Sequence, residues 1–131
     1  MKKLLAIGLL VLVAVVVGLV PVSGQEATPE PLAVFGAYAT PIEEPWDGVI
    51  HQALLKAQEA GTITYTYQDN IGYSGDMEVV LRDVAEEQHP AIIFGDGFGN
   101  EEAIRRVAKD YPEIAFVFGS GLGPSSPNLS V

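Results

Sequence analysis

Along this chain, short runs of apolar residues alternate with segments in which apolar residues recur every three or four positions. Four runs rich in apolar, β-branched or aromatic residues predict strands, over residues 31–38, 62–67, 91–94 and 114–118. The runs at 31–38, 91–94 and 114–118 are apolar enough to be buried. Three amphipathic segments predict helices, over residues 46–60, around 77–85 and over 101–111. This alternation predicts an α/β fold, a doubly wound parallel sheet with helices on both faces.

The predicted helix ends carry residues that are typical of helix starts and stops. Ser74 is expected to cap the second helix and Asn100 the third, because short polar side chains accept bonds from free N–H groups. Gly61 follows the first helix at a C-terminal stop position, and Pro112 ends the third. Tyr111 is expected on the buried face of the third helix.

The first 24 residues have the pattern of a secretory signal peptide. Lys2 and Lys3 precede a 17-residue apolar run, residues 4–20, and small residues lead to a predicted cleavage site after Gly24. A retained membrane anchor is the alternative, since 17 residues are marginal for spanning a bilayer. In both cases a short linker, 25–31, and a domain over 32–131 are expected outside the cytoplasm, in the periplasm or at the cell surface.

Composition narrows the function classes. A chain of 131 residues suits one domain at most, and its net charge of −10 becomes −12 without Lys2 and Lys3, with 5 basic and 17 acidic residues left. This charge disfavours nucleic acid and anionic membrane surfaces as partners. The absence of cysteine excludes disulfides and thiolate chemistry, and two histidines make a zinc site improbable. No metal or other cofactor is expected.

The loops that follow the predicted strands are the candidate ligand site, because in doubly wound sheets these loops gather at one edge. They span residues 40–47, 69–75, 95–100 and 119–124 and are rich in glycine, aromatic and acidic residues. Carboxylates without nearby Lys or Arg favour a neutral polyhydroxylated or a cationic ligand over a phosphate. Neither glycine loop matches a dinucleotide fingerprint. Ordinary turns with exposed carboxylates are the alternative.

Two stretches, ATPIEEPWDGVIHQALLKA at 39–57 and residues 92–131, resemble the basic-membrane-protein family of ABC-transporter substrate-binding proteins, which includes purine-nucleoside receptor lipoproteins. The resemblance implies a periplasmic-binding-protein type I fold that closes on its ligand between two lobes. It also implies delivery to a membrane permease and no enzymatic activity. Only the first lobe is expected here. The sequence reaches residues 127–131 about where a fifth strand would begin, and the second lobe would be missing.

The resemblance also assigns site residues. Trp46 and Asp47 match the family's aromatic–polar pair after the first strand, where the aromatic ring stacks on the base. His51 matches a histidine found in some branches, although a packed or hinge-facing role is favoured for it over a ligand role. Phe98 matches the family's glycine–phenylalanine loop. The candidate ligand-binding residues are therefore Trp46, Asp47, Asp96, Gly97, Phe98 and Ser120.

The chain departs from the family pattern in three ways. The lipid-anchoring cysteine is absent, Glu43-Glu44-Pro45 replaces an aspartate and a small polar residue, and the sequence stops at Val131. Without the rest of the first lobe, an apolar sheet would expose an edge and part of a face, which predicts that the chain alone is poorly soluble or oligomeric.

Several residues have structural interpretations beside the functional ones. Trp46 could pack on the sheet, Asp47 could serve the helix dipole, and Phe98 could pack under its loop. His89 is expected at the surface. Tyr65 and Tyr67 are expected in the sheet, and Tyr73 is a weak ligand candidate.

Other function classes stay open. Ser120 lies in a Gly-Ser-Gly loop, but no helix follows it as a nucleophile elbow requires. Asp96 fits one receiver-domain position, but residues 38–40 lack the acidic residue of another. An exported interaction or sensory ligand-binding domain without transport, or a non-functional fragment, is the alternative to a transport receptor.

Overall fold

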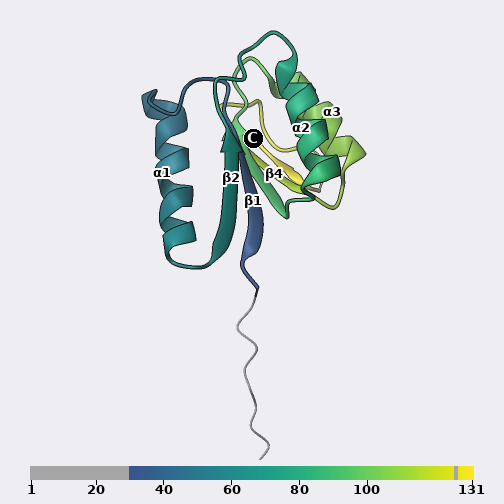
Figure 1. The fold of residues 1–131 in the computed structure, drawn as a ribbon. Helices are drawn as coiled ribbons and strands as arrows, with labels where there is room; N and C mark the ends of the chain where they lie inside the picture. Colours follow the sequence, from purple (N-terminus) through teal and green to yellow (C-terminus); the bar gives the residue numbers. More distant parts are fainter. Residues whose placement is uncertain (1–29, 126) are drawn as a thin grey trace, which may run out of the picture.

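A computed structural model describes residues 30–125 and 127–131, so the predicted signal peptide and most of the linker lie outside the described residues. Five strands form one parallel sheet in the order β2-β1-β3-β4-β5 (Figure 1). The strands are β1 (Leu32–Ala37), β2 (Ile63–Gln68), β3 (Ile92–Asp96), β4 (Ala115–Gly119) and β5 (Leu129–Ser130). The helices are α1 (Pro45–Glu59), α2 (Asp76–Glu87) and α3 (Glu101–Asp110).

The predicted elements and fold class are confirmed. Each of the four predicted strands and three predicted helices is present within a few residues of its expected bounds. The fifth strand begins at Leu129, where it pairs in parallel with Phe116 of β4. The structure is an α/β fold with helix α1 on one face of the sheet and α2 and α3 on the other (Figure 1).

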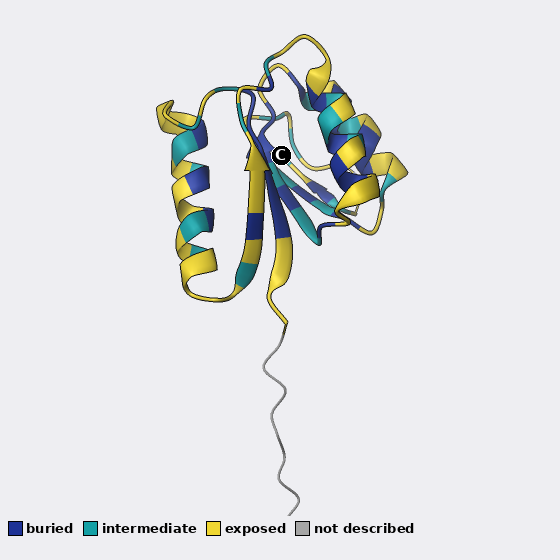
Figure 2. Ribbon diagram, in the orientation of Figure 1, coloured by how far each residue is buried: buried dark blue, intermediate teal, exposed yellow. Residues whose placement is uncertain are grey.

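The two faces of the sheet are covered unequally. The larger core lies between the sheet and the helices α2 and α3, whose sheet-facing sides are buried (Figure 2). The smaller core, under α1, contains the buried residues Val34, Leu54 and Tyr65. Farther along the same face, the alternate residues Ile92 and Phe94 of β3 are only half-buried, as are their β4 neighbours Ala115 and Val117.

The predicted caps need correction. The N-cap of α2 is Gly75, with φ 104°, and the hydroxyl of Ser74 instead donates to the Asp76 carboxylate at 2.9 Å. Asn100 does hold the N-cap position of α3, but its side chain makes no capping bond because its amide donates to the carbonyl of Gly72. Both polar side chains have found partners outside their own helix backbone.

The observed C-terminal ends of the helices agree more closely with the sequence-based prediction than the N-terminal caps do. Gly61 lies just beyond α1 with φ 75°, the left-handed conformation that glycine adopts without strain. Tyr111 lies one residue beyond α3 as its C-cap, half-buried, rather than on the helix itself. His89 is exposed, as expected.

Candidate functional site

Four loops meet at the edge of the sheet where the strands end, at the top of Figure 1. The loop after β1 is bonded to the loop after β2, since the N–H of Asn70 donates to the carbonyl of Thr40 at 3.1 Å. The amide of Asn100 joins the loop after β2 to that after β3 by its 3.0 Å bond to Gly72. Gly97 then donates to the carbonyl of Gly119 at 2.8 Å, which reaches the end of β4. The parallel topology and these bonds bring the predicted loops together.

Trp46 lies in the first turn of α1 and remains 59% exposed. Its indole approaches the end of β4, because a Cβ added to Gly119 would lie 3.5 Å from Cζ2 of the indole. Glycine at this position therefore leaves room beside the ring. Trp46 is not buried against the sheet, and its exposed surface is available to stack on a flat group.

Asp47, the next residue, is 1% exposed. Its Oδ2 accepts bonds from the backbone N–H of Thr40 at 3.0 Å and from the Thr40 hydroxyl at 2.6 Å. This pair of bonds fastens the loop after β1 to the start of α1. Its Oδ1 is buried and has no hydrogen-bond partner among the described residues. A buried carboxylate oxygen without a donor is costly, and this one lies beneath the surface of the loop edge.

The loop after β3 holds three of the predicted residues. Asp96 is 9% exposed, and its Oδ1 accepts a bond from the N–H of Phe98 at 3.1 Å. At Gly97 an added Cβ would come within 2.9 Å of the Gly119 carbonyl oxygen, so only glycine fits this approach. Phe98 is 66% exposed and does not pack under its loop. Its ring meets Tyr73 edge to face, with centroids 6.3 Å apart.

Ser120 is exposed directly after β4 and has φ 62°, a left-handed conformation that is uncommon for serine. The residues that follow are held by α3, because the Glu101 carboxylate accepts the N–H of Leu122 at 3.0 Å and Arg105 donates to the carbonyl of Gly123 at 2.7 Å. These bonds hold the loop after β4 against the start of α3, near the loops that follow β1, β2 and β3.

The expectation that no Lys or Arg lies near these loops needs correction, because Arg105 bonds to the loop after β4 and Arg106 lines the hollow at Tyr73. Carboxylates nevertheless come from several of the loops. Partial burial raises the pKa of the Tyr73 hydroxyl, and the carboxylates of Asp96 and Asp47 raise it further. Asp69 accepts the N–H of Ile42 at 3.2 Å. Such a surface favours groups that donate hydrogen bonds or carry positive charge.

A buried polar group under α1 was not foreseen as a unit. The Tyr38 and Tyr65 hydroxyls are 2.8 Å apart, and Tyr65 also bonds to Nδ1 of His51 at 2.9 Å. His51 is thus a packed residue, as favoured from sequence, and Tyr65 and Tyr67 lie in β2 as expected. Gly36 is required here, since an added Cβ would lie 2.7 Å from the Tyr38 hydroxyl. Sequence reasoning found no signal for this contact, because it joins three separate elements.

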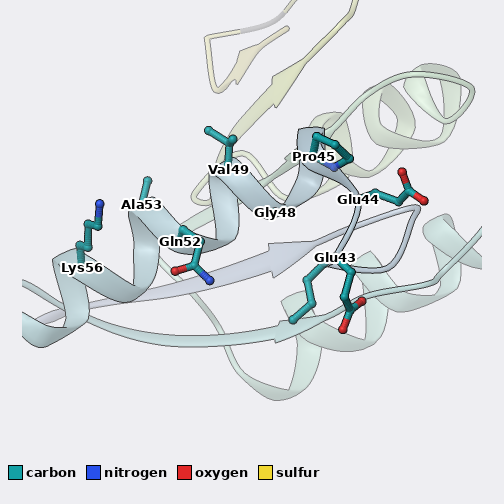
Figure 3. A pocket seen from close by; sticks show the side chains of 9 residues that line it. Glu43, Glu44, Pro45, Gly48, Val49, Gln52, Ala53 and Lys56 are labelled. Atoms are coloured by element: carbon teal, nitrogen blue, oxygen red, sulfur yellow. The ribbon is translucent and has the colours of Figure 1, made fainter.

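Two open hollows flank the loop edge. One, of about 490 Å³, lies between Tyr73, Leu122 and the start of α3. The other, of about 530 Å³, is a groove between the loop at Glu43 and the outer side of α1 (Figure 3). Neither hollow contains Trp46, Asp96 or Phe98 in its lining. Trp46 instead lines a smaller apolar hollow of about 210 Å³, together with Pro45, Val49 and Ile50. The predicted residues therefore share none of these three hollows as a common pocket.

The described part of the chain contains no group of three or more His, Cys, Asp or Glu side chains placed to hold a metal ion. None of its helices combines the length and the apolar character that crossing a membrane requires.

Comparison with known proteins identifies a solved structure with a similar fold. No protein-family model matches the chain, and no curated protein matches it. Among solved structures, the chain is similar to an ABC transporter system solute-binding protein from Conexibacter woesei, with a TM-score of 0.57 and 18% sequence identity. The similarity covers 65% of this chain and only 28% of that protein. The chain therefore shares the fold of part of a solute-binding protein.

Proposed function

We propose that this chain is the first lobe of an extracytoplasmic solute-binding protein of an ABC importer, of the basic-membrane-protein family. It would bind a small polar ligand, such as a purine nucleoside, against a second lobe and deliver it to a membrane permease. The N-terminal segment would direct export as a signal peptide. The fold shared with a solute-binding protein and the resemblance in residues 39–57 and 92–131 support this proposal.

The observation that carries the proposal is the meeting of an exposed tryptophan with carboxylates at the loop edge. Trp46 offers a flat apolar surface beside Gly119, and the buried Oδ1 of Asp47 lacks a donor. A nucleoside combines a flat base with ribose hydroxyls, which match these two features. The open loop edge suits a site that a second lobe would close.

The first test is a ligand screen. Thermal-shift assays with nucleosides, sugars and amines would be run on this chain and on a two-lobed relative. We expect nucleosides to stabilise the two-lobed protein, because ligand binding to the folded state raises its stability. Stabilisation of neither protein by any of the three classes would contradict the proposed function.

The second test uses Trp46, the only tryptophan of the chain. Base–aromatic stacking is worth about 1–3 kcal/mol in nucleic-acid binders, so Trp46→Ala should weaken binding roughly 5- to 150-fold. Trp46→Phe should keep most of the affinity. Calorimetric titration with the ligand found in the screen gives the affinities, and quenching of the single indole reports stacking directly. Unchanged affinity in a folded Trp46→Ala variant would remove the stacking role.

Asp47 can be tested separately. Asp47→Ala should reduce affinity more for hydroxyl-rich ligands than for deoxy analogues, because only the former lose a hydrogen-bond partner. Asp47→Asn, which can keep an acceptor for Thr40, controls for loosening of the α1 start. Equal losses for both ligand types would assign Asp47 a purely structural role.

A further inference from the structure

The outer face of α1 differs from the solvent-facing side of an ordinary surface helix. Its exposed positions include Pro45, Val49 and Ala53, and Val49 is 70% exposed. By contrast, α3 turns Glu102, Arg106 and Lys109 toward solvent, among other polar residues. A helix face with so little charge is typical of one that packs against another helix.

Charged residues stand at the two ends of this face and have opposite signs. Figure 3 shows Val49, Ala53 and Lys56 following one another along α1, with Glu43 and Glu44 beyond its N-terminal end. Glu44 and Lys56 are twelve positions apart, or about 18 Å along a helix. The face is therefore acidic at its start, apolar in its middle and basic at its end.

Such a face is complementary to an antiparallel copy of itself. In a two-fold pair centred at the level between Ile50 and His51, the exposed Val49 lies level with Gln52 of the second copy, and Pro45 with Lys56. Glu44 then lies level with Ala57 of the second copy, next to Lys56. The two-fold symmetry forms this Glu44–Lys56 pair twice. Antiparallel helices also align their dipoles favourably.

The loop before α1 limits the approach at Gly48, because an added Cβ there would lie 2.5 Å from the Ile42 carbonyl oxygen. A second helix can therefore meet α1 at Val49, Gln52 and Ala53, which are exposed and line the groove. Helices that pack against one another have axes about 8–10 Å apart. The groove of about 530 Å³ along this face gives room for the opposing side chains.

We infer that two copies of this chain associate through the outer faces of α1, in an antiparallel two-fold contact. Charge complementarity favours a second copy as the partner. When the same face is presented in the antiparallel direction, Glu44 of each chain lies opposite Lys56 of the other. This inference goes beyond the proposed transport function and does not depend on it. The contact uses Val49 and Ala53 and borders the candidate site, because Val49 and Trp46 line the same apolar hollow of about 210 Å³.

Cross-linking of the full chain, in the form in which its host exports it, tests the proximity. The chain has no cysteine, so Val49→Cys introduces one thiol close to the two-fold axis. A short bis-maleimide should link two Val49→Cys chains at least about tenfold faster than two Val79→Cys chains. Val79 is the matched control, because it is an exposed valine, at 58%, on helix α2. Equal rates for the two variants would overturn the inference.

Charge exchange tests the pairing, by sedimentation at low ionic strength, where surface charges are least screened. Lys56→Glu should raise the dimer dissociation constant about tenfold, since each symmetric pair turns from attraction to repulsion. Adding Glu44→Lys to Lys56→Glu should restore association to within about threefold of the parent. Lys109→Glu, the same change in the last turn of α3, should have no effect.

Circular dichroism on every variant establishes that it is folded. A parent chain that is monomeric throughout the accessible concentration range would overturn the inference. So would association that responds equally to Lys56→Glu and Lys109→Glu, or to neither. The last result would locate self-association on the half-buried sheet face around Phe94 and Val117.

Discussion

The two faces of the sheet are built by different means. Under α2 and α3, an apolar core that includes Leu81, Ile104 and Phe116 is fully excluded from water. Under α1, the buried core is small, and the hydrogen-bonded group of Tyr38, Tyr65 and His51 occupies much of the interface. One face is held chiefly by apolar burial, and the other depends more on directional bonds.

The outer surfaces of the two layers differ as well. Helices α2 and α3 are joined by two ion pairs, from Arg106 to Glu78 at 2.7 Å and from Arg82 to Asp110 at 2.9 Å. On α1, the outer face is nearly free of charge between Glu44 and Lys56. The α2–α3 layer is thus complete in itself, whereas the α1 layer has surface left for a partner. Trp46 of the candidate site also belongs to the α1 layer.

Truncation of buried leucines should show the largest difference between the two faces of the sheet. Leu81→Ala, in the larger core, is expected to lower the free energy of unfolding by about 4 kcal/mol, and Leu54→Ala, in the smaller core, by about 2 kcal/mol. The residue type is the same, and Leu81 is 0% exposed while Leu54 is 8% exposed. Chemical denaturation gives both values. Equal losses would mean that the two faces are packed equally well.

Loss of the tyrosine hydroxyl should have the next largest effect. Tyr65→Phe leaves the buried Tyr38 hydroxyl and Nδ1 of His51 without this partner, at an expected cost of about 1–3 kcal/mol. Tyr67→Phe on the same strand is the control, since Tyr67 is 44% exposed and meets His51 through a ring contact. If the two variants lose equal stability in denaturation, the hydrogen-bonded group does not hold α1 in place.

Alkaline pH should weaken the α1 face. Burial, with smaller contributions from neighbouring charges, raises the pKa of Tyr65 to about 12 and raises the pKa of Tyr38 as well. A raised pKa contributes stability below the unfolded value, near 10, that is lost as pH rises through the folded value. Hydrogen exchange should therefore show α1 loosening first between pH 10 and 12.

Acidic pH should weaken the other layer. Hydrogen bonds from Arg106 and Arg82 lower the pKa of Glu78, and the Leu122 N–H and Arg105 lower that of Glu101. Their stabilising effect is present above the unfolded value, about 4.3, and is lost as pH falls through the folded values. Glu101→Gln should reduce this acid dependence in thermal melts. An acid profile identical to that of the parent would remove Glu101 from this role.

The smallest expected effect concerns Ser74. Because its hydroxyl bonds to the exposed Asp76 side chain and not to the helix backbone, Ser74→Ala should change stability by less than about 0.5 kcal/mol. A true N-cap would cost about 1 kcal/mol. Denaturation curves with overlapping midpoints would support the corrected cap, and a loss near 1 kcal/mol would restore the sequence-based one.

Local sequence pattern determined the elements and the fold class. The short apolar runs at 91–94 and 114–118 predicted strands, and the spacing of Met77, Leu81 and Val84 placed one face of α2 in the core. These signals depend on neighbours along the chain, so they are readable without tertiary information. Parallel topology then placed Trp46, Asp96 and Ser120 at one edge, because the loops after parallel strands share it.

Only the tertiary structure decided how those residues behave there. Asn100 and Ser74 have the right chemistry for caps, but partners from other segments or neighbouring side chains take their hydrogen bonds. The fastening of Thr40 by Asp47 and the approach of Trp46 to Gly119 join residues that the sequence does not mark as partners. A hydrogen bond requires a distance and an angle as well as a donor and an acceptor, and the packing of separate elements sets both.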